Sequence, residues 1–113
     1  MERRPALSEY AAMWLFTVYD LPVDTREQRC EHARFRKDLK RHGFMMLQFS
    51  VYARYCPSEE GSQVYRKRVR AFLPAHGQVR LISITDRQFA KMEVFFGKNR
   101  RPAEDQPAQL MLF

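Results

Sequence analysis

A run of seven strand-forming residues, 13–19, most strongly constrains the fold of this chain. The run reads Met-Trp-Leu-Phe-Thr-Val-Tyr, contains one hydroxyl among apolar side chains, and ends at Asp20, which Leu21 and Pro22 follow. Such a run predicts a central strand that is covered on both faces. The carboxylate of Asp20 at the end of this strand needs water, a hydrogen-bond donor or a metal ion. Asp20 is therefore the first candidate for chemistry.

The length and net charge of the chain limit the number of domains and the kinds of partner that it can have. Its 113 residues are enough for one domain, and its net charge of +7 favours a polyanionic partner, with nucleic acid ahead of a membrane surface. Cys30 and Cys56 lie far apart and show no zinc-ligand spacing. No apolar stretch is long enough to span a membrane, so we expect a cytoplasmic protein that is not bound to a membrane.

Hydrophobic periodicity and turn residues predict the order strand, helix, strand, strand, helix, strand. Asp24 or Thr25 can cap the first helix, and Gly43 ends it. Residues 92–96 fit either a helix end or a further strand. The expected strands cover residues 13–19, two segments within 44–55 that join near 48–50, and 79–85; the expected helices cover 25–42 and 62–73, with a helical turn at 86–89.

This order predicts an α+β, ferredoxin-like βαββαβ domain whose two helices cover one face of the sheet. The other face would expose aromatic and aliphatic side chains, which favours a bound partner or a homodimer. The composition divides the chain into an N-terminal arm (1–11), the domain (12–97), a polar linker (98–109) and an apolar C-terminal tail (110–113). We expect the tail to dock as a strand in the homodimer.

Asp20 can be interpreted in two ways. It can bind Mg²⁺ or Mn²⁺, which prefer carboxylate oxygens, and act as the catalytic residue of phosphodiester hydrolysis. It can also cap the following helix or form a turn. One carboxylate makes a poor metal site, but a two-fold dimer would bring two copies of Asp20 to one axis. Tyr19, Ser50 and Tyr52 are expected to line the same site.

Basic residues cover the outer arcs of both predicted helices and are candidates for phosphate contacts. A solvated surface is the alternative, but few acidic residues balance these cations. The candidates for nucleic-acid binding are Arg26, Arg29, Arg34, Lys37, Arg41, Arg66 and Arg70.

Two other functions fit the sequence poorly. Ser50 has no matching histidine and aspartate, so a serine nucleophile is disfavoured. Residues 48–52 lie where an RNA-recognition motif would carry its signature, but they lack that signature's glycines and basic start.

Three segments together resemble the CRISPR-associated Cas2 family. They are Phe-Thr-Val-Tyr-Asp-Leu-Pro at 16–22, Phe-Arg-Lys-x-Leu at 35–39 with Gly43 and Phe44, and Met-x-Gln-Phe-Ser-Val-Tyr at 46–52. Thr-Asp-Arg-Gln-Phe at 85–89, followed by Gly97 and the apolar tail, continues the resemblance. These segments are most similar to the form found in type II CRISPR systems. Tyr52 stands where that family has phenylalanine.

The resemblance implies a ferredoxin-like homodimer that bridges the Cas1 integrase and binds duplex DNA while new spacers are acquired. It also implies a metal-dependent endonuclease acting on RNA or DNA, with Asp20 at the position of the Mg²⁺ ligand. Arg26 and Arg29 both match the arginine that follows the aspartate in the family. A stand-alone, toxin-like Mg²⁺-dependent endoribonuclease of the same fold is the alternative.

Overall fold

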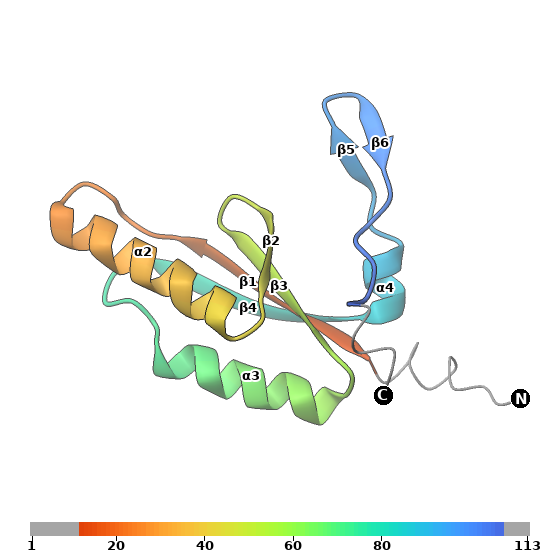
Figure 1. Ribbon diagram of the computed structural model, residues 1–113, viewed down its shortest axis with the longest axis horizontal. Coiled ribbons are helices and arrows are strands. Elements are labelled where there is room, and N and C mark those ends of the chain that lie inside the picture. Colours follow the sequence, from red (N-terminus) through yellow and green to blue (C-terminus); the bar gives the residue numbers. More distant parts are fainter. Residues whose placement is uncertain (1–11, 108–113) are drawn as a thin grey trace, which may run out of the picture.

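The computed structural model describes residues 12–107; the predicted N-terminal arm and the apolar tail at 110–113 lie outside the described residues. Six strands and three helices follow one another along this part of the chain (Figure 1). They are β1 (Met13–Asp20), α2 (Arg26–Arg41), β2 (Met45–Gln48), β3 (Val51–Cys56), α3 (Glu59–Ala71), β4 (Gln78–Thr85), α4 (Asp86–Ala90), β5 (Val94–Phe96) and β6 (Asn99–Arg101).

Four strands form one sheet in the order β2-β3-β1-β4, and their pairings are antiparallel. This is an α+β arrangement with the strand order of a ferredoxin-like fold, as the sequence predicts. The apolar run at 13–19 forms β1, and β1 lies between β3 and β4. The prediction of a central strand is therefore confirmed.

Helices α2 and α3 lie on the same side of the sheet (Figure 1). Phe35 and Leu39 of α2 and Val69 of α3 pack against Leu15 and Tyr52 of the sheet in one buried cluster. These helix positions recur at intervals of three to four residues, which places them on one stripe of each helix. Most basic residues of both helices are exposed for the same reason, whereas Arg66 is half-buried.

Capping residues set the first turn of each long helix. Thr25 forms a capping box with Gln28, so α2 begins at the predicted place. Ser58 accepts a hydrogen bond from the Gly61 amide at 3.0 Å, so α3 begins at Glu59. The predicted start at residue 62 was therefore three residues too late, because the segment 56–61 reads as a loop unless Ser58 is recognised as a cap.

The second face of the sheet is partly covered, although the sequence predicted that it would be open. The ring of Phe89 in α4 stacks on Trp14, with 3.9 Å between ring centroids. Asp86 accepts a hydrogen bond from Trp14 Nε1 at 2.7 Å and another from Gln106 Nε2 at 2.6 Å. Ala103 also packs against this cluster. The chain therefore covers the end of the face that carries Trp14.

Residues 98–109, for which the composition indicated a linker, contain strand β6. The ambiguous segment 92–96 contains β5, and the two strands pair around Gly97, whose φ is +65°. Glycine adopts this left-handed conformation without the penalty that a side chain brings. The polar composition of residues 98–101 reflects exposure of the hairpin, and residues 102–107 form no helix or strand, as expected for a linker.

Two residues of β1 differ sharply in their expected contribution to stability. Leu15→Ala should lower the free energy of unfolding by about 2–5 kcal/mol, because Leu15 is fully buried in the helix-side cluster. Thr17 is also fully buried, but its Oγ1 has no hydrogen-bond partner within residues 12–107. Thr17→Val should therefore be neutral or stabilising, since it removes an unsatisfied polar group. Urea unfolding of both variants measures the two free energies. An equal loss of unfolding free energy in the two variants would contradict the prediction.

Candidate functional site: the end of strand β1 and the basic helix α2

The side chain of Asp20 is exposed at the end of β1. Side chains alternate along a strand, and Leu15, Thr17 and Tyr19 are buried toward the helices, so Asp20 belongs to the opposite face. Its carboxylate makes no hydrogen bond or ion pair with any residue in 12–107, and Thr25 is the cap of α2. A helix-capping role for Asp20 is therefore wrong, and its oxygens face solvent.

The backbone of Asp20 is held by a close approach of the α3–β4 loop. Gly77 has a φ of +95°, and a Cβ atom there would lie 2.7 Å from the Asp20 carbonyl oxygen. A side chain at Gly77 would therefore push this loop away from the end of β1. The preceding residue, His76, places Nδ1 3.6 Å from the Glu31 carboxylate of α2.

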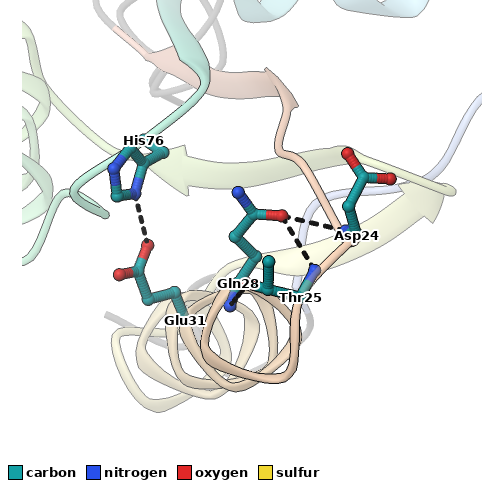
Figure 2. A network of polar contacts seen from close by, with 5 residues as sticks. All are labelled: Asp24, Thr25, Gln28, Glu31 and His76. Atoms are coloured by element: carbon teal, nitrogen blue, oxygen red, sulfur yellow. Dashed lines mark hydrogen bonds and ion pairs between the residues drawn. The ribbon is translucent and has the colours of Figure 1, made fainter.

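Figure 2 shows the contact of His76 with Glu31 together with the capping box of α2. The Gln28 side-chain oxygen accepts hydrogen bonds from the backbone amides of Asp24 at 2.9 Å and Thr25 at 3.1 Å. The capping box therefore holds the start of α2, and the close approach of Gly77 holds the backbone of Asp20. These contacts place the Cα atom of Asp20, whereas its exposed carboxylate is free to take up a ligand.

A single copy of the chain offers few ligands for a metal. Residues 12–107 contain no group of three or more His, Cys, Asp or Glu side chains suited to hold an ion. Mg²⁺ in nucleic-acid enzymes is often held by one or two carboxylates together with water and substrate phosphates. The free carboxylate of Asp20 fits that pattern with a phosphate or a second copy as a further ligand, and it does not fit a closed site within one copy.

Tyr19 and Tyr52 do not share the face of Asp20. Both are buried toward the helices, with their rings stacked at 6.1 Å between centroids. Ser50 lies in the β2–β3 turn with a φ of +66°, and its carbonyl oxygen accepts the Tyr19 amide at 3.1 Å. Of the three residues expected to line the site, only Ser50 is placed at its border, because the alternation of β1 and β3 turns both tyrosines into the core.

Burial perturbs the pKa of two residues in this core. It raises the pKa of Tyr19 to about 12, with Tyr52 adding to the shift, and it raises the pKa of Cys56 to about 11. Both groups are therefore neutral at physiological pH. Neither is suited to act as a base or a nucleophile.

These shifts predict a loss of stability at high pH. The Cys56 thiol ionises near 9 when unfolded and near 11 when folded, so the unfolded chain releases its proton first as the pH rises. The contribution of this group to the free energy of unfolding should be constant below pH 9 and should be lost between 9 and 11, by up to about 3 kcal/mol. Cys56→Ala should show a smaller fall over the same range in urea titrations. An identical fall in both proteins would contradict the assignment.

The basic residues predicted for nucleic-acid binding fall into two groups. Arg34, Lys37 and Arg41 are exposed along one stripe of α2 that faces away from Phe35 and Leu39. Arg34 and Lys37 make no ion pair within residues 12–107, whereas Arg41 pairs with Asp38 at 2.6 Å. This stripe, Arg34, Lys37 and Arg41, is called the α2 basic stripe below.

Some of the other arginines that were predicted to bind nucleic acid form hydrogen bonds within the protein. Arg29 donates hydrogen bonds to the carbonyls of Val23 and Asp24, whereas Arg26 is exposed without such contacts. Arg66 donates a hydrogen bond to Ser83 of β4 at 2.8 Å, so it ties α3 to the sheet. Arg70 is exposed near the end of α3.

The sequence did not reveal that Asp86 joins the start of α4 to Trp14 of β1. The pattern Thr-x-x-Gln at 85–88 is a capping box, and it was a signal for a helix that begins at Asp86. The hydrogen bond between Asp86 and Trp14 joins residues 72 positions apart, and no local pattern predicts such a contact.

Comparisons with known proteins identify the family of this chain. A sequence profile of the family described as "CRISPR associated protein Cas2" matches residues 13–92. The chain is 50% identical over 101 residues to a protein from Parvibaculum lavamentivorans, covering 89% of this chain and all of that protein. It is 44% identical over 109 residues to a protein from Flavobacterium psychrophilum, covering 96% and 93% of the two chains. Both relatives are named "CRISPR-associated endoribonuclease Cas2".

The matched region contains both parts of the candidate site, the end of β1 with Asp20 and the basic helix α2. In the described part of the chain, no helix has the length and hydrophobicity required to cross a membrane. On the profile match and on the identity to these relatives, the chain belongs to the Cas2 family of CRISPR-associated proteins.

Proposed function

We propose that this protein acts in CRISPR adaptation as a homodimer that holds duplex DNA on the α2 basic stripe and bridges the Cas1 integrase. The α2 basic stripe is the observation that carries the proposal. Its cations are exposed and they lie on the layer that faces away from the sheet. Cations presented in a row on one rigid helix suit the phosphate backbone, which is recognised without regard to sequence.

The homodimer is supported by the remaining open part of the second sheet face. Ile82 of β4 is 44% exposed there, and Phe16 and Val18 of β1 are only partly covered. Apolar side chains on a central strand are rarely left to solvent in a monomer. A second copy on this face would also place a second Asp20 near the first. The resemblance to the type II form belongs to the same proposal.

The salt dependence of DNA binding tests this function. If three cations per copy contact phosphates, the plot of log affinity for duplex DNA against log salt concentration should have a slope of about −3 per copy or steeper. Fluorescence anisotropy with a labelled duplex of random sequence measures the slope. Binding that does not change with salt would exclude phosphate recognition by the basic stripe.

A second candidate function is hydrolysis of RNA. The exposed carboxylate of Asp20, which has no hydrogen bond or ion pair with the described residues 12–107, favours it. The relatives from Parvibaculum lavamentivorans and Flavobacterium psychrophilum are named as endoribonucleases. When bound, Mg²⁺ or Mn²⁺ would polarise a phosphate and activate water. Asp20 would hold the ion from the end of β1, where its carboxylate is exposed. The exposed cations of α2 would hold the RNA backbone nearby.

The same residues also fit the stand-alone, toxin-like endoribonuclease. The two roles differ in what they require of the α2 basic stripe and of Asp20. A scaffold requires the stripe and tolerates loss of the carboxylate, whereas a ribonuclease requires the carboxylate. Separate substitution of the two sites therefore distinguishes them.

A further inference from the structure

One hydrogen bond closes the last part of the described chain into a loop. The side-chain amide of Gln106 donates to a carboxylate oxygen of Asp86 at 2.6 Å, across 20 positions of sequence. Helix α4 and the β5–β6 hairpin lie within this loop. Residues 102–107, called the strap below, follow β6 and form no helix or strand. The hairpin is therefore tied to the rest of the molecule on one side through α4 and on the other side through the hydrogen bond of the strap.

Asp86 is the fixed end of this hydrogen bond. Its other carboxylate oxygen accepts a hydrogen bond from Trp14 Nε1 at 2.7 Å, and its backbone amide donates to the Ala12 carbonyl at 3.0 Å. In the same short helix, Phe89 is buried, and its ring stacks on Trp14 with 3.9 Å between centroids. Hydrogen bonds to an ionised carboxylate are stronger than those between neutral groups. Gln106 therefore binds a strong acceptor that is held against the sheet.

The β5–β6 hairpin has few contacts of its own with the domain. Within residues 12–107, its two strands of three residues pair only with each other, and residues 95–101 are exposed. The hairpin projects beyond α4, away from the layer of α2 and α3 (Figure 1). A two-stranded hairpin without further cover is at best marginally stable by itself. The orientation of the hairpin is therefore set at its base.

The base of the hairpin is loosely packed. An open hollow of about 560 Å³ lies there, and residues of both connections line it, among them Met92, Pro102 and Glu104. Met92 and Ala103 pack against the cluster around Trp14, but both are only partly buried. The methionine side chain is flexible and the alanine side chain is small, so these contacts hold the hairpin weakly. The hollow leaves room for a movement about residues 91–93.

From these contacts we infer that Asp86 and Gln106 form a clasp that holds the β5–β6 hairpin in one orientation. When the clasp opens, the strap leaves α4 and the hairpin pivots about residues 91–93. A ligand that binds the released strap would stabilise the open clasp and so move the hairpin. The inference does not rest on the proposed function, because none of these residues belongs to the α2 basic stripe or to the end of β1.

Two substitutions test the clasp as a pair. Gln106→Glu removes the donor and sets a second carboxylate against that of Asp86, so the clasp should open. Asp86→Asn in the same chain should close it again, because the asparagine amide can donate to the new carboxylate while its oxygen still accepts from Trp14 Nε1. Loss of one hydrogen bond to a charged group should raise the ratio of open to closed clasp at least about tenfold. Gln48→Glu is the matched control, since Gln48 is exposed at the end of β2.

The distance between the hairpin and α2 reports the state of the clasp. Cys30 is exposed on α2, and Lys98→Cys adds a thiol in the exposed turn of the hairpin. Cys56 is buried, and burial raises its pKa to about 11, so it should stay unlabelled. Spin labels on the two exposed thiols give the distribution of this distance by pulsed electron paramagnetic resonance. Excess unlabelled protein is added so that distances between copies do not contribute.

We expect one narrow distance distribution in the labelled chain with an intact clasp, a second population in Gln106→Glu, and one narrow distribution again when Asp86→Asn is added. A second population with the clasp intact, none in Gln106→Glu, an equal one in Gln48→Glu, or no recovery in the pair would overturn the inference. Trp14 is the one tryptophan of the chain, and its emission should stay the same in every variant. A red shift in Gln106→Glu would also overturn the inference, because the hydrogen bond would then hold α4 on the sheet rather than orient the hairpin.

Discussion

Replacing Arg34, Lys37 and Arg41 with glutamine is expected to weaken binding of duplex DNA by about two to three orders of magnitude at about 0.1 M salt. The three side chains are exposed on one stripe of α2, and removing three phosphate contacts per copy should also make the salt slope shallower by about 3. Fluorescence anisotropy over a salt series measures both quantities. The fold should be retained, because none of the three residues is buried.

The matched control removes cations elsewhere on the surface. Arg80 lies on β4 and Lys91 follows α4, and both are exposed. Arg80→Gln combined with Lys91→Gln lowers the net charge without touching α2. If this control loses as much affinity as the α2 variant, the DNA is attracted by net charge and the basic stripe has no special role.

Asp20→Asn is expected to lower the rate of any metal-dependent RNA cleavage by a factor on the order of a thousand. Asparagine keeps the size of the side chain and loses the negative charge that would hold Mg²⁺. The carboxylate is exposed and makes no hydrogen bond or ion pair within residues 12–107, so the variant should unfold at the same urea concentration as the wild type. Cleavage of labelled RNA with Mg²⁺ and with EDTA measures the effect.

Cleavage that survives in purified Asp20→Asn would assign the activity to other residues or to a contaminant. Asp24→Asn is the control, since Asp24 is an exposed carboxylate only four residues away in the same connection. Its backbone amide is engaged by Gln28, and its side chain is not required for the capping box. Loss of cleavage in both variants would indicate a general effect of negative charge near β1.

Local patterns predicted most of the central fold. The apolar run of β1, the Thr25 capping box and Gly43 are signals that one sequence segment carries by itself, and each gave an element at nearly the observed position. The split of 44–55 into two strands was also correct, with the turn at Phe49 and Ser50. These elements depend on local backbone geometry, which the neighbouring residues in the sequence determine.

Contacts between distant segments were not predictable in the same way. The sequence suggested that Tyr19 and Tyr52 line a site beside Asp20, Tyr52 because it shares one face of its strand with Ser50. The phase of β1 and β3 relative to the helices instead turns both tyrosines into the core. The cover of the second face by Phe89 depends on its stacking with Trp14, 75 positions earlier in the chain. Such contacts depend on how distant strands pair in the sheet, so no single segment of the sequence predicts them.

The candidate site was predictable in part for the same reason. Asp20 stood out because a carboxylate after an apolar run needs an explanation. In the structure it is exposed and has no hydrogen bond or ion pair with any residue in 12–107. Arg66 was grouped with the phosphate contacts from helix periodicity, yet its hydrogen bond to Ser83 commits it to the fold. Periodicity places a residue on an arc of a helix, but it does not show which neighbour the side chain reaches.

Reconstituted spacer integration with the Cas1 integrase tests the central proposal most directly. The same assay is run with the wild-type protein, with Asp20→Asn and with the α2 variant that lacks Arg34, Lys37 and Arg41. A scaffold that holds DNA predicts integration at the wild-type level for Asp20→Asn and a loss of integration for the α2 variant. Loss of integration in Asp20→Asn together with full activity of the α2 variant would contradict it.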